Sequence, residues 1–177
     1  MKILIIGPLG AGKSSLAHAL NKKFNFPRLN LDEICRNPEN GDYYSLENSF
    51  KKLNIFIKAH NNWVIEGSQS YLYKKTSPDL IIDMRILRLV AIGRFTYRFF
   101  KAKKLIGKNI DKNLPVQAYH YRKITLSKIL DWDSANKEIN QQITDYLKNT
   151  KIQVLTCKSF RDYQKIFDYI EFSKIIF

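Results

Sequence analysis

The 177-residue chain has few cysteines, few acids and no long hydrophobic run, and each shortage excludes a class of protein. Its two cysteines, Cys35 and Cys157, lie far apart and form no C-x-x-C pair, which argues against a disulfide framework or a zinc site. No stretch approaches the roughly 18 uncharged apolar residues that a transmembrane helix needs. The apolar start, Met1–Ile6, is broken by glycine and lysine too early for a signal peptide. We therefore expect a soluble, cytoplasmic protein with no membrane span.

Acidic residues are scarce relative to basic ones, since 16 Asp and Glu stand against 30 Lys and Arg, a net charge of +14. Between Arg85 and Lys128 there are twelve basic residues and a single acid, Asp111, so the excess is localised. Such an excess favours a polyanionic partner, which could be a nucleotide, a nucleic acid or an anionic membrane, although a lysine-rich composition alone also raises the charge. At 45% hydrophobic residues the chain can still bury a core, which excludes a wholly disordered protein.

Glycine is also scarce, yet three of the seven glycines, Gly7, Gly10 and Gly12, fall within six residues. The run Lys2–Ile6 before them is short, apolar and β-branched, which predicts a buried strand. The segment Lys13–Phe24 after them has apolar residues at helical spacing. A strand, a glycine turn and a helix form the opening of an α/β unit.

Strands and helices alternate along the rest of the chain, which predicts a three-layer α/β/α fold with one parallel sheet in a single domain, residues 1–177. The further predicted strands are Arg28–Leu31, Trp63–Ile65, Leu80–Ile82 and Ile152–Thr156. The further predicted helices are Asp42–His60, Ile86–Lys104, Val116–Leu130, Ser134–Asn149 and Tyr163–Ile170, with a loop from about Leu105 to Pro115.

The glycine turn is a complete Walker A motif, G-x-x-x-x-G-K-S/T, in its required place between a strand and a helix. Its backbone N–H groups and the helix N-terminus should bind phosphates, with Lys13 on the β- and γ-phosphates and the Ser14 hydroxyl on Mg²⁺. The expected nucleotide-binding residues are Gly7, Pro8, Leu9, Gly10, Ala11, Gly12, Lys13, Ser14 and Ser15. The chain lacks the N-K-x-D sequence that guanine-specific proteins usually carry, so ATP is favoured over GTP.

Acids follow three of the predicted strands, where α/β proteins bind ligands. Glu66 and Asp83 compete for the metal, because a nucleoside triphosphate site needs an acid at a strand end to hold Mg²⁺. Glu66 could instead be a turn carboxylate, and Asp83 could cap a helix beginning near Arg85. Asp32 could orient or deprotonate an acceptor hydroxyl, or merely cap a helix, and Arg36 could hold an anionic group on the acceptor or stay exposed.

Four features of the sequence together resemble the small adenylate-kinase-like P-loop kinases, nearest the topology modulation proteins. These features are the Walker A motif, or P-loop, the pair Leu31-Asp32, the segment Trp63–Gly67, and the R-x-x-x-R pair of Arg94 and Arg98. The resemblance covers about residues 1–104. It implies a five-stranded parallel sheet of order 2-3-1-4-5, an acceptor-binding helical segment over 33–61 and a lid at about 101–120.

The same resemblance implies roles for individual residues. It favours Glu66 over Asp83 as the metal residue and puts the Glu66-Gly67 pair at the substrate. It also places the Arg94 and Arg98 face over the nucleotide, to stabilise phosphoryl charge or stack on the base. The arginine of true adenylate kinases falls on Ser70 here, which argues against adenylate as the acceptor.

We therefore expect ATP-dependent phosphoryl transfer from Mg-ATP to a small-molecule acceptor, as in a nucleotide or nucleoside kinase, with ATP and Mg²⁺ as cofactors. The alternative is a nucleic-acid-associated P-loop ATPase, a topology-modulation-like regulator whose basic helix contacts DNA or RNA. A third reading is an ATP-binding protein that has lost catalysis.

Overall fold

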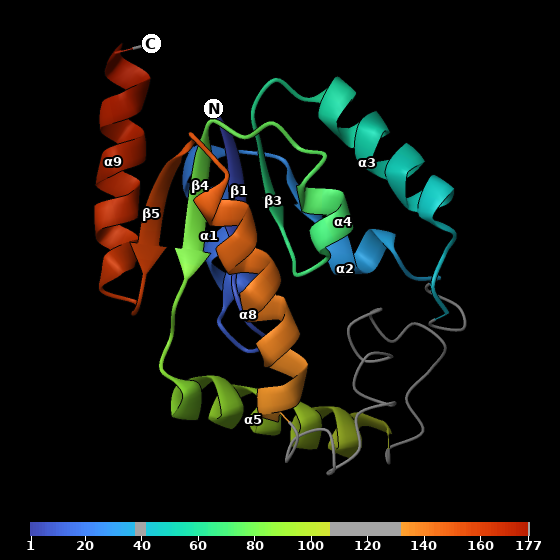
Figure 1. Cartoon of the computed structure of the whole chain (residues 1–177). Helices are drawn as coiled ribbons and strands as arrows, with labels where there is room; N and C mark the ends of the chain where they lie inside the picture. The colour runs from blue at the N-terminus through green and yellow to red at the C-terminus, as the bar shows by residue number, and fades with distance from the viewer. Residues whose placement is uncertain (38–41, 107–131, 177) are drawn as a thin grey trace.

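A computed structural model describes residues 1–37, 42–106 and 132–176, and it contains a five-stranded, all-parallel sheet (Figure 1). The strand order is β2-β3-β1-β4-β5, which confirms the predicted fold class and topology. The strands are β1 (Lys2–Ile6), β2 (Arg28–Asn30), β3 (Trp63–Glu66), β4 (Leu80–Met84) and β5 (Gln153–Cys157).

Helices connect successive strands, as expected of a parallel sheet, and a last helix follows β5. They are α1 (Lys13–Phe24), α2 (Leu31–Ile34), α3 (Leu46–Ala59), α4 (Ser70–Tyr73), α5 (Arg88–Ile106), α8 (Trp132–Lys148) and α9 (Asp162–Ile176). Within the described ranges, no helix is both long enough and apolar enough to span a membrane.

The two faces of the sheet bury alternate residues of β1. Ile3 and Ile5 join one apolar cluster with residues of α1 and α9. Leu4 and Ile6 join a second cluster with residues of α3, α4 and α8. Figure 1 shows α8 in front of the sheet and α1 behind it, so both faces are covered. Full burial of each such side chain stabilises the fold by about 1.5–3 kcal/mol, which makes these clusters the main stabilising term.

The chain differs from its predicted elements at several boundaries. The bounds of β1 and α1 are confirmed, but β2 ends at Asn30, because Leu31 begins a short helix. Helix α4 was not predicted, and α5 begins at Arg88, two residues later than expected. The predicted loop and helix over 107–130, and most of the predicted lid at about 101–120, lie outside the described residues.

Helix α5 lies across the edge of the sheet toward which the strands point (Figure 1). A Cβ on Gly10, in the loop after β1, would come within 2.5 Å of the Ala91 carbonyl oxygen of α5. The glycine loop and α5 are therefore in direct backbone contact at the carboxyl edge.

Candidate active site

The loop between β1 and α1 has the backbone geometry that its glycines allow. Gly10 and Gly12 have φ of 78° and 95°, which L side chains rarely adopt. Gly12 is the N-cap of α1, so no side chain caps this helix, and its first turn contains no acid. The positive end of α1 thus faces the loop with no acid in its own first turn, which suits phosphate binding.

Lys13 is the first residue of α1, directly after this loop, and is only 7% exposed. Its Nζ donates hydrogen bonds to the carbonyl oxygens of Gly7 at 2.9 Å and Pro8 at 3.0 Å. These bonds curl the side chain over the loop and hold the ammonium charge where phosphates should bind.

Glu66 is the last residue of β3 and is 1% exposed, paired in register with Ile5 of β1. Burial raises the pKa of its carboxyl, while the positive charge of Lys13 and a hydrogen bond from the Ser14 side chain oppose this. A buried carboxylate is therefore in contact with the P-loop hydroxyl. Hydroxyl and carboxylate oxygens are the donors that Mg²⁺ prefers, so this pair fits the expected metal.

Asp83 lies inside β4, beside Ile6, and is 4% exposed. Its Oδ2 accepts a 2.6 Å hydrogen bond from Arg85 Nε. The alternative in which Asp83 caps a helix near Arg85 is wrong, because α5 begins only at Arg88. One oxygen of Asp83 is thus neutralised by a guanidinium, whereas Glu66 contacts the P-loop itself.

Asn30 links the acids of the site, and the sequence patterns did not identify it. Its Oδ1 accepts hydrogen bonds from the N–H groups of Asp32 and Glu33, so Asn30 is the N-cap of α2. Its Nδ2 donates to Oε1 of Glu66 at 2.9 Å. The expectation that Asp32 comes directly after a strand is therefore wrong, because Leu31 already begins α2, and so is the alternative that Asp32 is the cap.

Asp32 lies in the first turn of α2, and two side chains from the segment after β3 donate to its Oδ1. These are Gln69 Nε2 at 3.1 Å and Ser68 Oγ at 3.5 Å. Gly67 is buried, and a Cβ there would come within 2.7 Å of Leu31 Cβ. Close packing against α2 accounts for this glycine, and its contact with substrate stays a prediction.

Arg36 follows α2 and is paired with Tyr43 across an isolated antiparallel bridge. Its guanidinium stacks on the Tyr43 ring at 3.9 Å and donates to the Tyr43 hydroxyl. The side chain thus packs on Tyr43 at the start of the segment expected to bind the acceptor, and its role in binding stays a prediction.

Arg94 extends from α5 onto the P-loop. Its Nη1 donates to the Ala11 carbonyl oxygen at 3.3 Å, and its Cζ lies 4.8 Å from the centre of the Phe160 ring. The structure therefore places Arg94 between the P-loop and the loop after β5. Arg98 lies one turn further along α5, but its side chain lies outside the described part of the chain.

Asn136 of α8 is a second contact that the sequence did not reveal. It is 1% exposed, and its Oδ1 accepts a 2.7 Å hydrogen bond from the N–H of Leu9 in the P-loop. Because 127 residues separate the partners, no local pattern points to this contact. It ties α8 to the loop that the motif defines.

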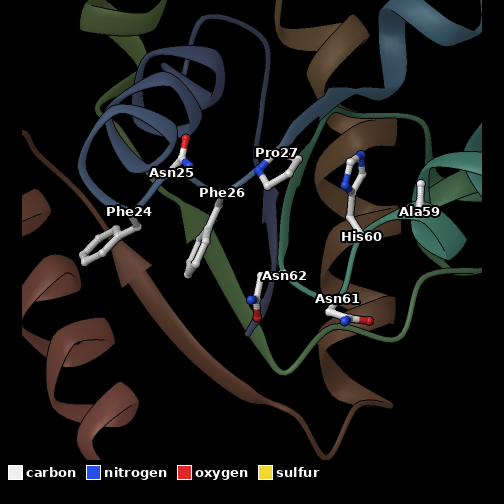
Figure 2. A pocket seen from close by; sticks show the side chains of 8 residues that line it. All are labelled: Phe24, Asn25, Phe26, Pro27, Ala59, His60, Asn61 and Asn62. Atoms are coloured by element: carbon white, nitrogen blue, oxygen red, sulfur yellow. The ribbon is translucent and has the colours of Figure 1, made fainter.

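A cleft of about 360 Å³ lies at the opposite, amino edge of the sheet (Figure 2). It is formed by the turns that precede β2 and β3, and its lining residues are Phe24, Asn25, Phe26, Pro27, Ala59, His60, Asn61 and Asn62. The lining contains no acid, lysine or arginine, so the charged groups of the P-loop site are absent from it.

The sequence is similar to one characterised kinase over part of its length. It is 34% identical over 108 residues to the deoxyguanosine kinase of Bacillus subtilis (strain 168), covering 58% of this chain and 51% of that protein. The chain thus spans about half the length of this curated relative. No protein-family model matches the sequence.

Solved structures show the same fold over nearly the whole chain. Deoxyadenosine kinase from M. mycoides with bound dATP matches with a TM-score of 0.52 and 11% identity, over 97% of this chain and 100% of that one. The same enzyme with bound dCTP matches with a TM-score of 0.53 and 18% identity, over 98% and 100%. These similarities support the resemblance to small P-loop kinases, and none of them concerns the topology modulation proteins, so that assignment stays a prediction.

Proposed function

We propose that this protein is a P-loop kinase that transfers the γ-phosphoryl group of Mg-ATP to a hydroxyl group of a nucleoside. The observation that carries the proposal is that the P-loop and two acidic side chains lie together at the carboxyl edge of adjacent strands. The P-loop follows β1, Glu66 ends β3, and Asp32 follows β2, with Asn30 joining the last two. The partial similarity to a deoxyguanosine kinase and the shared fold of the deoxyadenosine kinases favour a nucleoside acceptor.

The P-loop supplies the donor side of the reaction. Its backbone N–H groups, the N-terminus of α1 and Lys13 bind and orient the phosphates of ATP. Ser14 and Glu66 would hold Mg²⁺, which neutralises phosphate charge when bound. Arg94 adds a guanidinium at the loop, where it can stabilise charge that develops on the transferred group.

Asp32 supplies the acceptor side. Ser68 and Gln69 fix one carboxylate oxygen, so the carboxylate is held in one orientation. A carboxylate held this way can accept the proton of an acceptor hydroxyl as the hydroxyl attacks phosphorus. Arg36 is close to Asp32 in sequence and is our candidate for the residue that binds a polar group of the acceptor.

The experiment is a transfer screen with Mg-ATP and a panel of deoxynucleosides, ribonucleosides, nucleoside monophosphates and small alcohols, with products separated by chromatography. We expect a deoxynucleoside or ribonucleoside to give its monophosphate together with ADP. ATP hydrolysis without any phosphorylated product would contradict the proposal.

The second candidate, a nucleic-acid-associated ATPase, is favoured by the surface of α5. This helix exposes the apolar side chains of Leu89, Tyr97 and Phe100, and its first residue, the basic Arg88, is also exposed. Basic and aromatic side chains together are typical of nucleic-acid surfaces. DNA- or RNA-stimulated ATP hydrolysis, with no transfer to a nucleoside, would favour this candidate.

A further inference from the structure

Asn30 uses both ends of its side-chain amide, and each end contacts a different part of the site. Oδ1 accepts from the N–H groups of Asp32 at 2.8 Å and Glu33 at 3.2 Å. Nδ2 donates to Glu66 Oε1 at 2.9 Å. The residue is 9% exposed, so water competes little for these bonds.

The orientation of this amide follows from the chemistry of its neighbours. Backbone N–H groups only donate, so the amide oxygen must face Asp32 and Glu33. The amide nitrogen then faces Glu66, which can accept. A flipped amide would oppose donor to donor at α2 and oxygen to oxygen at Glu66, and buried polar groups left unpaired cost about 1–3 kcal/mol each.

The sheet register explains why one side chain reaches both sites. Asn30 and Glu66 are paired at the carboxyl ends of β2 and β3, and α2 begins directly after Asn30. The Glu66 carboxylate contacts Ser14 on its P-loop side, and Asn30 contacts it from the acceptor side. The side chain of Asn30 thus joins the expected metal carboxylate, Glu66, to the backbone of the helical turn that carries Asp32.

We propose that Asn30 is a positioning residue of the phosphoryl-transfer site, which holds Glu66 directly and holds Asp32 by capping α2. The proposal rests on the kinase function proposed above. The contact with Glu66 sets the orientation of the carboxylate toward Ser14 and Mg²⁺. The cap fixes the turn that carries Asp32.

Two substitutions separate the contact with Glu66 from the cap. Asn30→Ser keeps a good N-cap but is too short to donate to Glu66, whereas Asn30→Ala removes both functions. The matched control for the loss of a helix cap is Ser45→Ala, because Ser45 caps α3 through a 3.2 Å bond from the Asn48 N–H. Since Ser45 lies in the segment expected to bind the acceptor, this control is used for unfolding and for ATP binding. All variants are compared by thermal unfolding, so that a loss of fold is recognised.

Steady-state kinetics give the first readout. Asn30→Ser should lower kcat about 10–100-fold, the usual cost of losing a partner that orients a metal ligand, and leave the KM for the nucleoside unchanged. Asn30→Ala should lower kcat and also raise that KM. In a Glu66→Gln background, Asn30→Ser should cause little further loss, because residues that act through one another are not additive. An equal loss in both backgrounds, or wild-type kcat in Asn30→Ser, would overturn the proposal.

ATP-binding calorimetry with and without Mg²⁺ gives a readout that does not depend on transfer. Asn30→Ser should lose most of the affinity that Mg²⁺ adds, while Ser45→Ala should keep it. If the wild type transfers phosphate to no acceptor but shows this pattern, the kinase proposal fails and the role of Asn30 stands. An unchanged magnesium effect in Asn30→Ser, or no magnesium effect in the wild type, would overturn the role of Asn30.

Discussion

Arg94 and Ala11 are joined by a hydrogen bond from Nη1 to the backbone carbonyl oxygen at 3.3 Å, although 83 residues separate them. The same guanidinium lies over the ring of Phe160, in the loop after β5. A Cβ on Gly12 would come within 3.1 Å of Nη1, so a side chain there would shift the guanidinium slightly, and the φ of 95° already favours glycine at this position. The basic helix thus contributes a charge to the loop that the motif identifies.

Replacing Arg94 should affect the reaction more than the fold. Arg94→Ala should lower the transfer rate about 10–1000-fold, the scale of removing one donor that stabilises developing charge. The control is Arg88→Ala, since Arg88 is exposed and pairs with Asp133 at the surface. We expect the Arg88 variant to transfer phosphate normally, and Arg98→Ala to resemble Arg94→Ala.

The nucleic-acid alternative makes the opposite prediction for these variants. Removing each arginine would weaken nucleic-acid binding. It would also reduce, by about one unit, the slope of the logarithm of the binding constant against the logarithm of salt concentration. Unchanged transfer in Arg94→Ala, together with a reduced salt slope, would therefore contradict the role of Arg94 in catalysis.

Glu66→Gln should abolish most activity without harming the fold. The pKa of Glu66 in the folded chain is above its ordinary value of 4.5, because burial disfavours the charged form. The folded chain therefore holds this proton to higher pH than the unfolded chain does. The protonated Glu66 carboxyl contributes its full stability to the fold below pH 4.5, and this contribution is lost as pH rises through the folded pKa. Glutamine does not titrate, so the variant should gain stability relative to the wild type as the pH rises above 4.5.

Urea unfolding at a series of pH values measures this difference, and a transfer assay measures the activity. Asp83→Asn is the matched comparison, because Asp83 is also a buried acid at the carboxyl edge but pairs with Arg85. Should Asp83→Asn abolish transfer while Glu66→Gln preserves it, Asp83 and not Glu66 would serve the metal.

Asp32→Asn should reduce transfer while ATP affinity stays near the wild-type value, because Asp32 follows β2 and not the P-loop strand. Its control is Asp168→Asn on α9, where Asp168 accepts a bond from Gln164 Nε2 much as Asp32 accepts one from Gln69. Calorimetry with ATP and a transfer assay measure the two effects. A large loss of ATP binding in Asp32→Asn would contradict this division of roles.

Two glycine substitutions should have opposite effects on stability. Gly10→Ala places a Cβ within 2.5 Å of the Ala91 carbonyl at a φ of 78°, so it should destabilise the fold by about 1–3 kcal/mol. Gly93→Ala lies in α5 with no atom within 4 Å of its new Cβ, and should stabilise by about 0.4–1 kcal/mol. Thermal unfolding checks both, and a stabilised Gly10→Ala variant would show that the loop does not pack against α5 in this way.

The sequence predicted the elements that carry strong local signals. The bounds of β1 and α1 follow from a short apolar run and a glycine loop that separates it from a helical pattern. The end of β2 was predicted wrongly, although Asn30 before the acids Asp32 and Glu33 is itself a helix-start signal. Asp83 was predicted as a possible helix cap because the strand was predicted to end at Ile82, whereas β4 continues to Met84.

The contacts that complete the candidate site could not be read from local patterns. Three hydrogen bonds join residues that are far apart in the sequence. They link Asn30 with Glu66 across 36 positions, Leu9 with Asn136 across 127, and Ala11 with Arg94 across 83. Their formation depends on strand register and on the packing of α5 and α8 at the sheet edge. Such contacts are set by the tertiary fold, which propensity and periodicity do not contain.

The most direct test of the kinase proposal follows the γ-phosphate of labelled ATP in the wild type and in Lys13→Ala. The carbonyl oxygens of Gly7 and Pro8 accept hydrogen bonds from Lys13 at the P-loop. We expect its charge to act on the phosphates, and we expect the fold to survive its loss. The account predicts label on a nucleoside monophosphate with the wild type and none with Lys13→Ala, which should still unfold cooperatively. Label that appears only as inorganic phosphate, or equal transfer by both proteins, would contradict it.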